Sequence, residues 1–257
     1  MSRSADDISE DAVLGGRLRL RQLQRGHRVG HDAILLAAVC PARAGDRVVD
    51  LGAGVGAAGL AVAVRVTGTS VTLVEVEPTL ASLAEANAEL NGLAGRVRVL
   101  TLDVTAPARA FAAAGLAPES AMRVLMNPPF NDAGRQRVSP DRQRRLAHVA
   151  PRAALGTWVK TAARLLRPRG TLALIWRADG LQDVLAALAP AFGGAAVLPV
   201  YPKPQALAIR VLVRAVKGSR APLALLPGLV LADEAARPHP EAEAVLRDGQ
   251  SLSLADV

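Results

Sequence analysis

From residue 46 onward, short apolar runs alternate with longer helical patterns, and this alternation restricts the fold more than any other feature of the chain. Such alternation is typical of βαβ units, in which parallel strands form one sheet and helices cover its faces. The expected strands are Arg47–Leu51, Ser70–Glu75, Val97–Leu102, Arg123–Met126, Thr171–Trp176, Ala196–Tyr201 and Leu207–Val216. The expected helices are His31–Val39, Ala57–Val66, Pro78–Asn91, Ala106–Ala114, Ala153–Leu166 and Leu181–Leu188.

The last two expected strands follow one another without a clear helix, joined by Pro202-Lys203-Pro204. A direct connection of this kind predicts an antiparallel, hairpin-like edge. The sequence therefore predicts an α/β fold with a doubly wound, mostly parallel, seven-stranded Rossmann-like sheet and an antiparallel edge strand. Residues 46–217 are expected to form this domain, and residues 1–45 an N-terminal cap. Residues 218–257 form a proline-punctuated tail to which the pattern assigns no structure.

Composition narrows the class of protein further. The 257 residues suit one large domain, and a hydrophobic fraction of 51% is enough for a sizeable core. No apolar run approaches the ~18 residues that span a bilayer, so we expect no membrane segment. The single Cys40 and the acidic, polar N-terminus predict a cytoplasmic protein. His27 and His31 have a spacing that suits a metal, but no third ligand is nearby, and we expect none to bind.

A glycine-rich turn follows the first expected strand, where backbone can approach a ligand at the carboxyl edge of the sheet. Gly54, Gly56 and Gly59 match the dinucleotide pattern G-x-G-x-x-G. A second pattern has an acid before three alternate glycines: Asp50, Gly52, Gly54 and Gly56. A carboxylate two residues before the first glycine repels a pyrophosphate but attracts the ammonium and sulfonium groups of S-adenosylmethionine. The charge therefore favours S-adenosylmethionine.

Acidic residues also end the next two expected strands. Glu75 can accept hydrogen bonds from both ribose hydroxyls of the cofactor, and Asp103 can accept one from its adenine amine. Glu77 is close enough to replace Glu75 in this role, although its place before Pro78 also suits a first-turn acid of a helix. Acids at the ends of three successive strands, counting Asp50, favour a binding site at this edge.

The tetrapeptide Asn127-Pro128-Pro129-Phe130 follows the fourth expected strand. Two prolines make a rigid turn in which the Asn127 amide oxygen and the Pro128 carbonyl can both accept from one amino group. Phe130 offers a ring face on which a planar group can stack. An amino nitrogen conjugated to a ring or a carbonyl is a poor nucleophile. When two acceptors take hydrogen bonds from both of its N–H groups, its lone pair is directed at a methyl donor. The motif predicts methyl transfer to such a nitrogen, without a dedicated general base.

Arginines carry most of the net charge of +8 and form two runs. The run after Phe130 contains Arg135, Arg137, Arg142, Arg144 and Arg145. The run near the N-terminus contains Arg17, Arg19, Arg21, Arg25 and Arg28. Either run can be a solvated face, but the first one flanks the predicted catalytic turn. Because a polyanion carrying the target would lie there, we expect RNA as the partner and these arginines as phosphate contacts.

In this order, these motifs resemble those of class I methyltransferases that modify amino nitrogens. Other segments resemble one branch, the bacterial tRNA(Val) adenine-N6 methyltransferase family: Gly26–Leu36, Asn87, Asn91-Gly92, Tyr201–Pro204 and Ile209–Val213. The resemblance covers roughly residues 15–217. It implies S-adenosylmethionine as cofactor and N6 of adenine, in tRNA, as the methylated atom. It also implies that Asp32 lies over the methionine end of the cofactor and that Arg28 meets the substrate.

Two other functions remain open on the sequence. A glutamine side-chain amide fits the same two-acceptor turn, so an N5-glutamine protein methyltransferase is the alternative enzyme. A catalytically idle RNA- or nucleotide-binding module is the third hypothesis. The intact Asn127 and the acids Asp50, Glu75 and Asp103 argue against an idle module, and the arginine runs favour RNA over protein.

Overall fold

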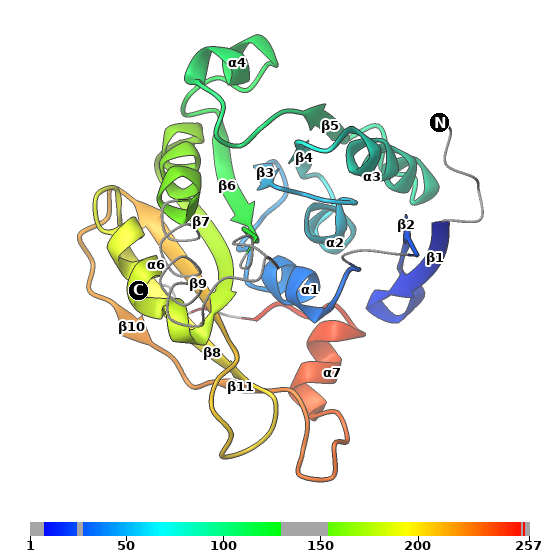
Figure 1. Ribbon diagram of the computed structural model, residues 1–257, viewed down its shortest axis with the longest axis vertical. Helices are drawn as coiled ribbons and strands as arrows, with labels where there is room; N and C mark the ends of the chain where they lie inside the picture. Colours follow the sequence, from blue (N-terminus) through cyan, green and yellow to red (C-terminus); the bar gives the residue numbers. More distant parts are fainter. Residues whose placement is uncertain (1–7, 25–27, 130–153, 253, 255–257) are drawn as a thin grey trace, which may run out of the picture.

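A single large sheet forms the centre of the molecule in the computed structural model, which describes residues 8–24, 28–129, 154–252 and 254. Its strands are β3 (Arg47–Leu51), β4 (Ser70–Glu75), β5 (Val97–Thr101), β6 (Ala121–Met126), β7 (Leu166–Arg177), β8 (Phe192–Tyr201), β9 (Arg210–Lys217), β10 (Ala224–Leu225) and β11 (Leu229–Val230). Within the described part of the chain the sheet has nine strands in the order β10-β8-β9-β7-β6-β3-β4-β5, and β11 also pairs with β8 (Figure 1).

The strand directions confirm the predicted fold class. Strands β3, β4, β5, β6 and β7 pair in parallel, whereas β9 is antiparallel to both β7 and β8. The chain starts in the middle at β3, proceeds to β5, and then returns across β3 to β6, which is the doubly wound arrangement. The antiparallel strand β9 lies between β7 and β8. The short strands β10 and β11, which come from the tail, extend the sheet beyond the seven predicted strands.

Helices occupy the segments where the sequence predicts them, and the helix ends that lie clear of the undescribed residues are within two residues of the expected ones. They are α1 (His31–Ala38), α2 (Ala57–Arg65), α3 (Pro78–Leu90), α4 (Ala108–Ala113), a helix over residues 154–165, and α6 (Leu181–Leu188). The tail adds α7 (Pro240–Leu246), which the sequence did not predict. Among the described residues, no helix has both the length and the apolar character needed to cross a lipid bilayer.

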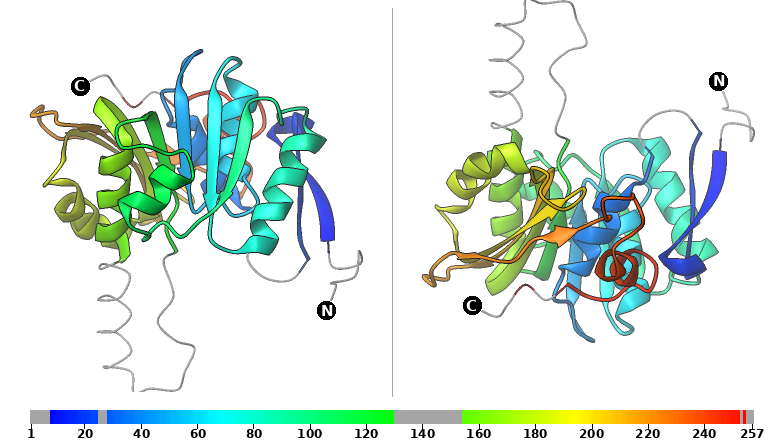
Figure 2. Two further views of the ribbon diagram at one scale, coloured as in Figure 1. Left: turned by 90° about the horizontal axis from the view of Figure 1, so that it is seen from above. Right: turned by 90° about the horizontal axis from the view of Figure 1, so that it is seen from below.

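Side chains that alternate along the strands form two hydrophobic cores, one on each face of the sheet. In β3, Val48 belongs to the core under α1, α2 and α3, whereas Val49 belongs to the core under α4, α6 and the helix over residues 154–165. In β6, Leu125 belongs to the same core as Val48, and Val124 belongs to the same core as Val49. The helices accordingly lie on both sides of the sheet (Figure 2).

A two-stranded hairpin of β1 (Ile8–Val13) and β2 (Leu18–Leu23) precedes the main domain, with a short 3-10 turn, η2 (Leu14–Gly16), between its strands. A second 3-10 turn, η3 (Ala178–Gly180), links β7 to α6. Leu18 and Leu20 of β2 are fully buried in the core that also holds α2 and α3. The hairpin therefore packs on one side of the domain (Figure 1).

Asn87 of α3 and Asn91, the C-cap of that helix, bind the backbone of β2. The Asn87 Oδ1 accepts from the Arg21 N–H at 2.7 Å, and its Nδ2 donates to the Arg21 carbonyl at 3.0 Å. Asn91 does the same for Arg19, at 2.9 and 2.7 Å. Four residues of a helix rise about 6 Å and two residues of a strand about 6.6 Å, so the two spacings match. Asn87 also donates to the Val55 carbonyl at 3.0 Å, which couples the hairpin to the glycine-rich loop.

Replacing Asn87 by alanine should destabilise the protein more than replacing Asn91. Asn87 is fully buried, and its loss leaves the polar groups of Arg21 and Val55 without their partner. We expect the free energy of unfolding to fall by about 2–4 kcal/mol for Asn87→Ala, and by about 1 kcal/mol for the half-buried Asn91→Ala. Urea denaturation measures both. Similar losses for the two variants would mean that β2 is held by packing alone.

Candidate active site

Strand register brings the predicted site residues to one edge of the sheet. Leu51 of β3 pairs with Val74 of β4 on one side and with Met126 of β6 on the other. The residues that follow these three lie side by side at the carboxyl ends of the strands: Gly52, Glu75 and Asn127. In open α/β sheets, ligands bind in the crevice outside this edge.

The loop after β3 has the backbone geometry of a ligand cradle. Gly52, Gly54 and Gly56 have φ angles of 70°, 57° and 90°, values that favour glycine. The Gly52 N–H donates to the Val74 carbonyl at 2.8 Å, which ties the loop to β4. A Cβ at Gly52 would collide with the Trp158 side chain, whereas a Cβ at Gly54 would have no other atom within 4 Å. The space beside Gly54 is therefore open to a ligand.

Glu75 supports this loop. Its side chain is buried, with Oε2 accepting from the Gly54 N–H at 2.7 Å and Oε1 accepting from the Glu77 N–H at 2.9 Å. Each carboxylate oxygen can accept a further hydrogen bond, so a contact with ribose hydroxyls stays a prediction that this geometry allows. Glu77, by contrast, accepts from the Thr79 N–H at the start of α3, which favours its interpretation as a helix cap.

Asp50 lies beneath the loop and is only 2% exposed. Alternation along β3 turns its side chain toward the face covered by α2, where Oδ2 accepts from the Gly59 N–H at 2.8 Å. Burial raises the pKa of the Asp50 carboxyl to about 7, against the lowering effect of the Gly59 N–H, and the nearby Glu75 raises it further. Direct contact of Asp50 with an ammonium group stays a prediction, and its burial favours a role in positioning α2 and the loop.

Asp103 lies two residues beyond β5 and is exposed. Its Oδ1 accepts from the Thr105 N–H at 2.7 Å and from the Thr105 hydroxyl at 2.8 Å. These bonds fix the turn after β5 and leave the other carboxylate oxygen, Oδ2, for a ligand. The predicted contact with the adenine amine of a cofactor stays a prediction.

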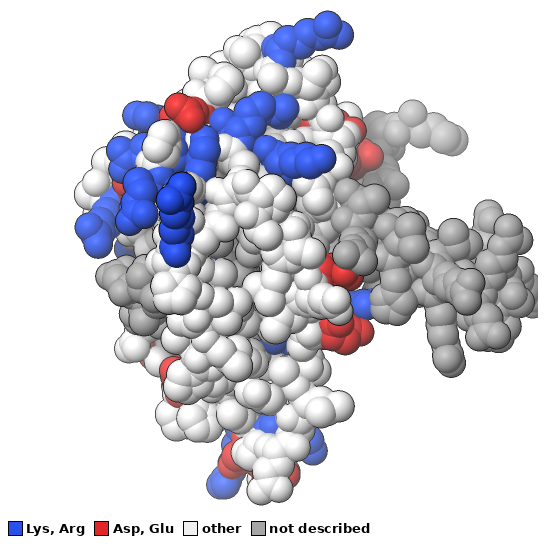
Figure 3. Space-filling model, turned by 90° about the vertical axis from the view of Figure 1, so that its left-hand side faces the viewer, with Lys and Arg blue, Asp and Glu red and all other residues white. Residues whose placement is uncertain are grey.

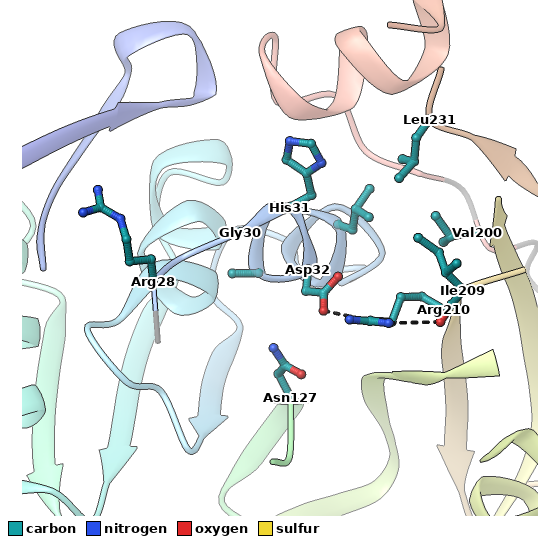
Figure 4. Close-up of a pocket in the computed structure, with 11 residues that line it drawn as sticks. Arg28, Gly30, His31, Asp32, Asn127, Val200, Ile209, Arg210 and Leu231 are labelled. Carbon is teal, nitrogen blue, oxygen red and sulfur yellow. Dashed lines mark hydrogen bonds and ion pairs between the residues drawn. The ribbon is translucent and has the colours of Figure 1, made fainter. Parts of the chain in front are cut away.

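A cavity of about 310 Å³ adjoins Asn127 at the end of β6. It lies between the N-terminus of α1 and the ends of β8 and β9, and its lining includes Arg28, His31, Asp32, Asn127, Ile209 and Arg210. Figure 4 shows that the Asn127 side chain points toward the helix that carries Asp32. Pro128 is buried and Pro129 is exposed, so the predicted catalytic turn begins at the cavity and reaches the surface.

Asp32 has a partner that the sequence did not reveal. Its Oδ2 accepts from the Arg210 Nε at 2.9 Å, in a half-buried ion pair between α1 and β9 (Figure 4). The signal in the sequence was a lone charge at the start of the apolar run Val211–Val213, but nothing there linked it to Asp32. The pair places one negative and one positive group in the cavity wall.

The N-terminal arginine run is partly neutralised by strand β1. Arg19 and Arg21 pair with Glu10, and Arg28 pairs with Asp11 at 2.8 Å. Three predicted elements lie outside the described residues, namely Phe130, Arg25 and the whole run from Arg135 to Arg145. Within the described ranges, no group of three His, Cys, Asp or Glu residues is arranged to hold a metal ion.

Known proteins are similar to this chain in sequence and in fold. A family model described as the methyltransferase small domain matches residues 27–199, more than half of the chain. The chain belongs to this family. A protein of Porphyromonas gingivalis named tRNA1(Val) (adenine(37)-N6)-methyltransferase is 30% identical over 161 residues, 61% of each chain. A protein of the same name from Tolumonas auensis is 32% identical over 167 residues, 65% of each chain. The match thus spans less than two thirds of the length of these curated relatives.

Solved structures agree with this membership. An Agrobacterium tumefaciens protein described as a predicted O-methyltransferase is 33% identical, with a TM-score of 0.74, over 88% of this chain and 100% of its own. A Thermotoga maritima S-adenosylmethionine-dependent O-methyltransferase is 21% identical, with a TM-score of 0.52, over 77% of this chain and 69% of its own. At that identity the second structure supports the fold alone.

Membership of the methyltransferase small domain family makes S-adenosylmethionine the cofactor. The described residues fit this molecule. The open space beside Gly54 lets a nucleoside approach the backbone, and the acids Glu75 and Asp103 lie at the ends of the neighbouring strands. Asp32 and Asn127 both line the neighbouring cavity. The cofactor-binding residues predicted from the sequence are thus arranged around one edge of the sheet.

The raised pKa of Asp50 gives a specific dependence of stability on pH. In the unfolded chain this carboxyl ionises near its ordinary value of about 3.9, whereas in the folded protein it ionises near pH 7. The unfolded state therefore loses its proton first, and stability falls by about 1.4 kcal/mol per pH unit between these values and then levels off. An asparagine at this position cannot ionise, so Asp50→Asn should be increasingly more stable than wild type from pH 4 to pH 7 by urea denaturation.

Gly54 and Gly92 form a matched pair for testing the cofactor cradle. Both have positive φ angles, 57° and 66°, and a Cβ at either would lie in open space. Alanine should therefore reduce stability similarly at both positions, by about 1–2 kcal/mol. Only Gly54→Ala should weaken binding of S-adenosylmethionine, by about tenfold or more, because its methyl group enters the cradle. Calorimetric titration of both variants measures this, and equal affinities would move the cofactor away from Gly54.

Proposed function

We propose that the protein transfers a methyl group from S-adenosylmethionine to the exocyclic N6 nitrogen of an adenine in tRNA. The observation that carries the proposal is Asn127-Pro128-Pro129 at the carboxyl end of β6, between the glycine-rich loop and the cavity lined by Asp32. The names of the curated relatives from Porphyromonas gingivalis and Tolumonas auensis support the same substrate. A tRNA substrate also supports a cytoplasmic location.

The chemistry follows from what Asn127 and the turn can do. The bound cofactor supplies an electrophilic methyl group on a sulfonium. The Asn127 amide oxygen and the Pro128 carbonyl accept hydrogen bonds from the two N–H groups of the adenine amino group. These bonds favour a more tetrahedral nitrogen and orient its lone pair along the path of transfer. As the N–C bond formed, the methyl–sulfur bond would break to leave a neutral thioether, and the methylated nitrogen would lose one of its protons to water. Positioning and electrostatic stabilisation provide the rate enhancement, and Phe130 is proposed to stack on the base.

An amino group fits this turn better than a hydroxyl as the group that receives the methyl. A hydroxyl has only one proton to donate, so a second carbonyl acceptor beside Asn127 would have no partner. A glutamine amide has two N–H bonds and would fit as well, but a basic surface favours RNA. The proposed RNA contacts are Arg28 at the cavity and the arginines after the turn: Arg135, Arg137, Arg142, Arg144 and Arg145.

Asp50, Gly52, Gly54, Gly56, Glu75 and Asp103 are the proposed cofactor contacts on the loop side, and Asp32 is the proposed contact for the methionine end. Of these, Glu75 is the last residue of β4, and it accepts a hydrogen bond from the Gly54 N–H. It therefore holds the loop in place beside the space proposed for the cofactor. Asp32 carries a negative charge that attracts the ammonium group, while its partner Arg210 is suited to the carboxylate of the same methionine moiety.

Methylation of unmodified tRNA tests the proposal. Bulk tRNA from a strain that lacks this protein is incubated with the purified protein and methyl-labelled S-adenosylmethionine, and its nucleosides are separated by mass spectrometry. We expect label in N6-methyladenosine, and little transfer to short single-stranded oligonucleotides. Label on a glutamine of a cellular protein, with none in RNA, would establish the glutamine methyltransferase instead.

Asn127→Ala should separate chemistry from cofactor binding. The amide oxygen is needed most when the nitrogen becomes tetrahedral, so kcat should fall by a factor of about 100 or more. Affinity for S-adenosylmethionine should change by less than about threefold, since the cradle beside Gly54 is intact. Single-turnover kinetics and calorimetric titration give the two values. A parallel loss of both would indicate that Asn127 only stabilises the turn.

A further inference from the structure

Basic side chains from separate segments gather at the amino ends of the parallel strands, opposite the candidate active site. Arg43 precedes β3 and Arg47 begins it, Arg167 and Arg169 form the exposed start of β7, and Arg220 follows β9. We call these five residues the amino-edge surface. All five are exposed.

The pairing of the strands brings these segments together. Leu166 at the start of β7 pairs with Ala121 of β6, and β6 is the neighbour of β3, which Arg47 begins. The Lys217 Nζ at the end of β9 donates to the Leu166 carbonyl at 2.6 Å, so the segment that leads to Arg220 also lies beside β7. Lys and Arg side chains gather with few acids at the upper left of Figure 3, which views the molecule from the left-hand side of Figure 1.

The amino-edge surface is not neutralised by acids. Across residues 8–24, 28–129, 154–252 and 254, none of its five guanidinium groups has a carboxylate oxygen within 4.0 Å. Two acids at this edge, just before β3 and β6, are already paired: Asp46 with Arg123 at 2.8 Å and Glu119 with Lys217 at 3.0 Å. The contrast is with the N-terminal run of arginines, where strand β1 provides the opposing acids Glu10 and Asp11.

We propose that the amino-edge surface binds the phosphate backbone of the RNA substrate at a distance from the base that is methylated. This inference rests on the proposed function for the identity of the RNA. Like charges held together repel, and a polyanion that contacts them releases its counterions, which favours association. Arginine also matches phosphate with two parallel N–H donors.

The separation of the two sites explains which RNA can use both. Strand β3 has five residues from Arg47 to Leu51, so about 16 Å separates the amino edge from the glycine-rich loop. A stacked strand advances roughly 3.4 Å per nucleotide, so this length corresponds to about five nucleotides, and the path around the domain is longer. A folded tRNA is long enough to reach both sites, whereas a stem–loop with a stem of about three base pairs, roughly 10 Å long, is shorter than this path.

Salt dependence of tRNA binding tests the inference. Arg167→Ala/Arg220→Ala removes two arginines that make no side-chain hydrogen bond within the described residues. The slope of log affinity against log salt for unfractionated tRNA should become shallower by about 1.4–1.8, and affinity at physiological salt should fall on the order of tenfold. The control, Arg237→Ala/Arg247→Ala, removes the same charge from two exposed arginines that pair with Asp233 and Glu243. It should leave the slope unchanged.

Activity on two substrates separates this contact from the active site. The double variant should raise KM for unmodified tRNA about tenfold and leave methylation of a short stem–loop that carries the target adenine unchanged, as well as S-adenosylmethionine affinity and the melting temperature. An unchanged slope, or equal changes in both double variants, would overturn the inference. A flattened slope in a protein that methylates no RNA would support the RNA surface while rejecting the proposed enzymatic function.

Discussion

The hydrogen bonding of β3 between β4 and β6 is the constraint on which the candidate site depends. It aligns the residues after Leu51, Val74 and Met126, so that a glycine, an acid and an amide meet at one edge. A shift of one residue in either pairing would exchange the two faces of the strand and separate these groups. The bond from the Gly54 N–H to Glu75 then holds the loop in the position that the register allows.

The elements outside the central sheet adjust this edge. Asn87 connects the backbone of β2 with the Val55 carbonyl, so the N-terminal hairpin supports the glycine-rich loop from behind. The side-chain amide of Gln22, which is buried, accepts from the Val29 N–H and donates to Asp11, and thereby fixes the segment that leads into α1. The Gln22 side chain thus holds the backbone at Val29, next to the cavity-lining Gly30, although no residue of the hairpin itself lines the cavity.

The sequence predicted what depends on local pattern and missed what depends on distant pairing. Strands such as Arg47–Leu51 were predicted because apolar runs and glycine turns mark both of their ends. The hairpin was missed because the alternation of leucine and arginine over residues 18–21 was interpreted as a charge run. The direction of Asp50 could have been predicted from the alternation along β3. The ion pair of Asp32 with Arg210 could not, since 178 residues separate them.

The packing of the tail against α1 has a consequence for the order in which the protein matures. Helix α7 packs on α1, and the Leu252 N–H donates to the Ala38 carbonyl at 3.0 Å, so the helix that carries Asp32 is completed by residues made late in synthesis. Arg210, the ion-pair partner of Asp32, is synthesised 178 residues after it. A ribosome-bound fragment can form the early strands but not the cavity wall. The Asp32 side of the cavity therefore takes shape only after residues 210–252 have been synthesised, later than the glycine-rich loop.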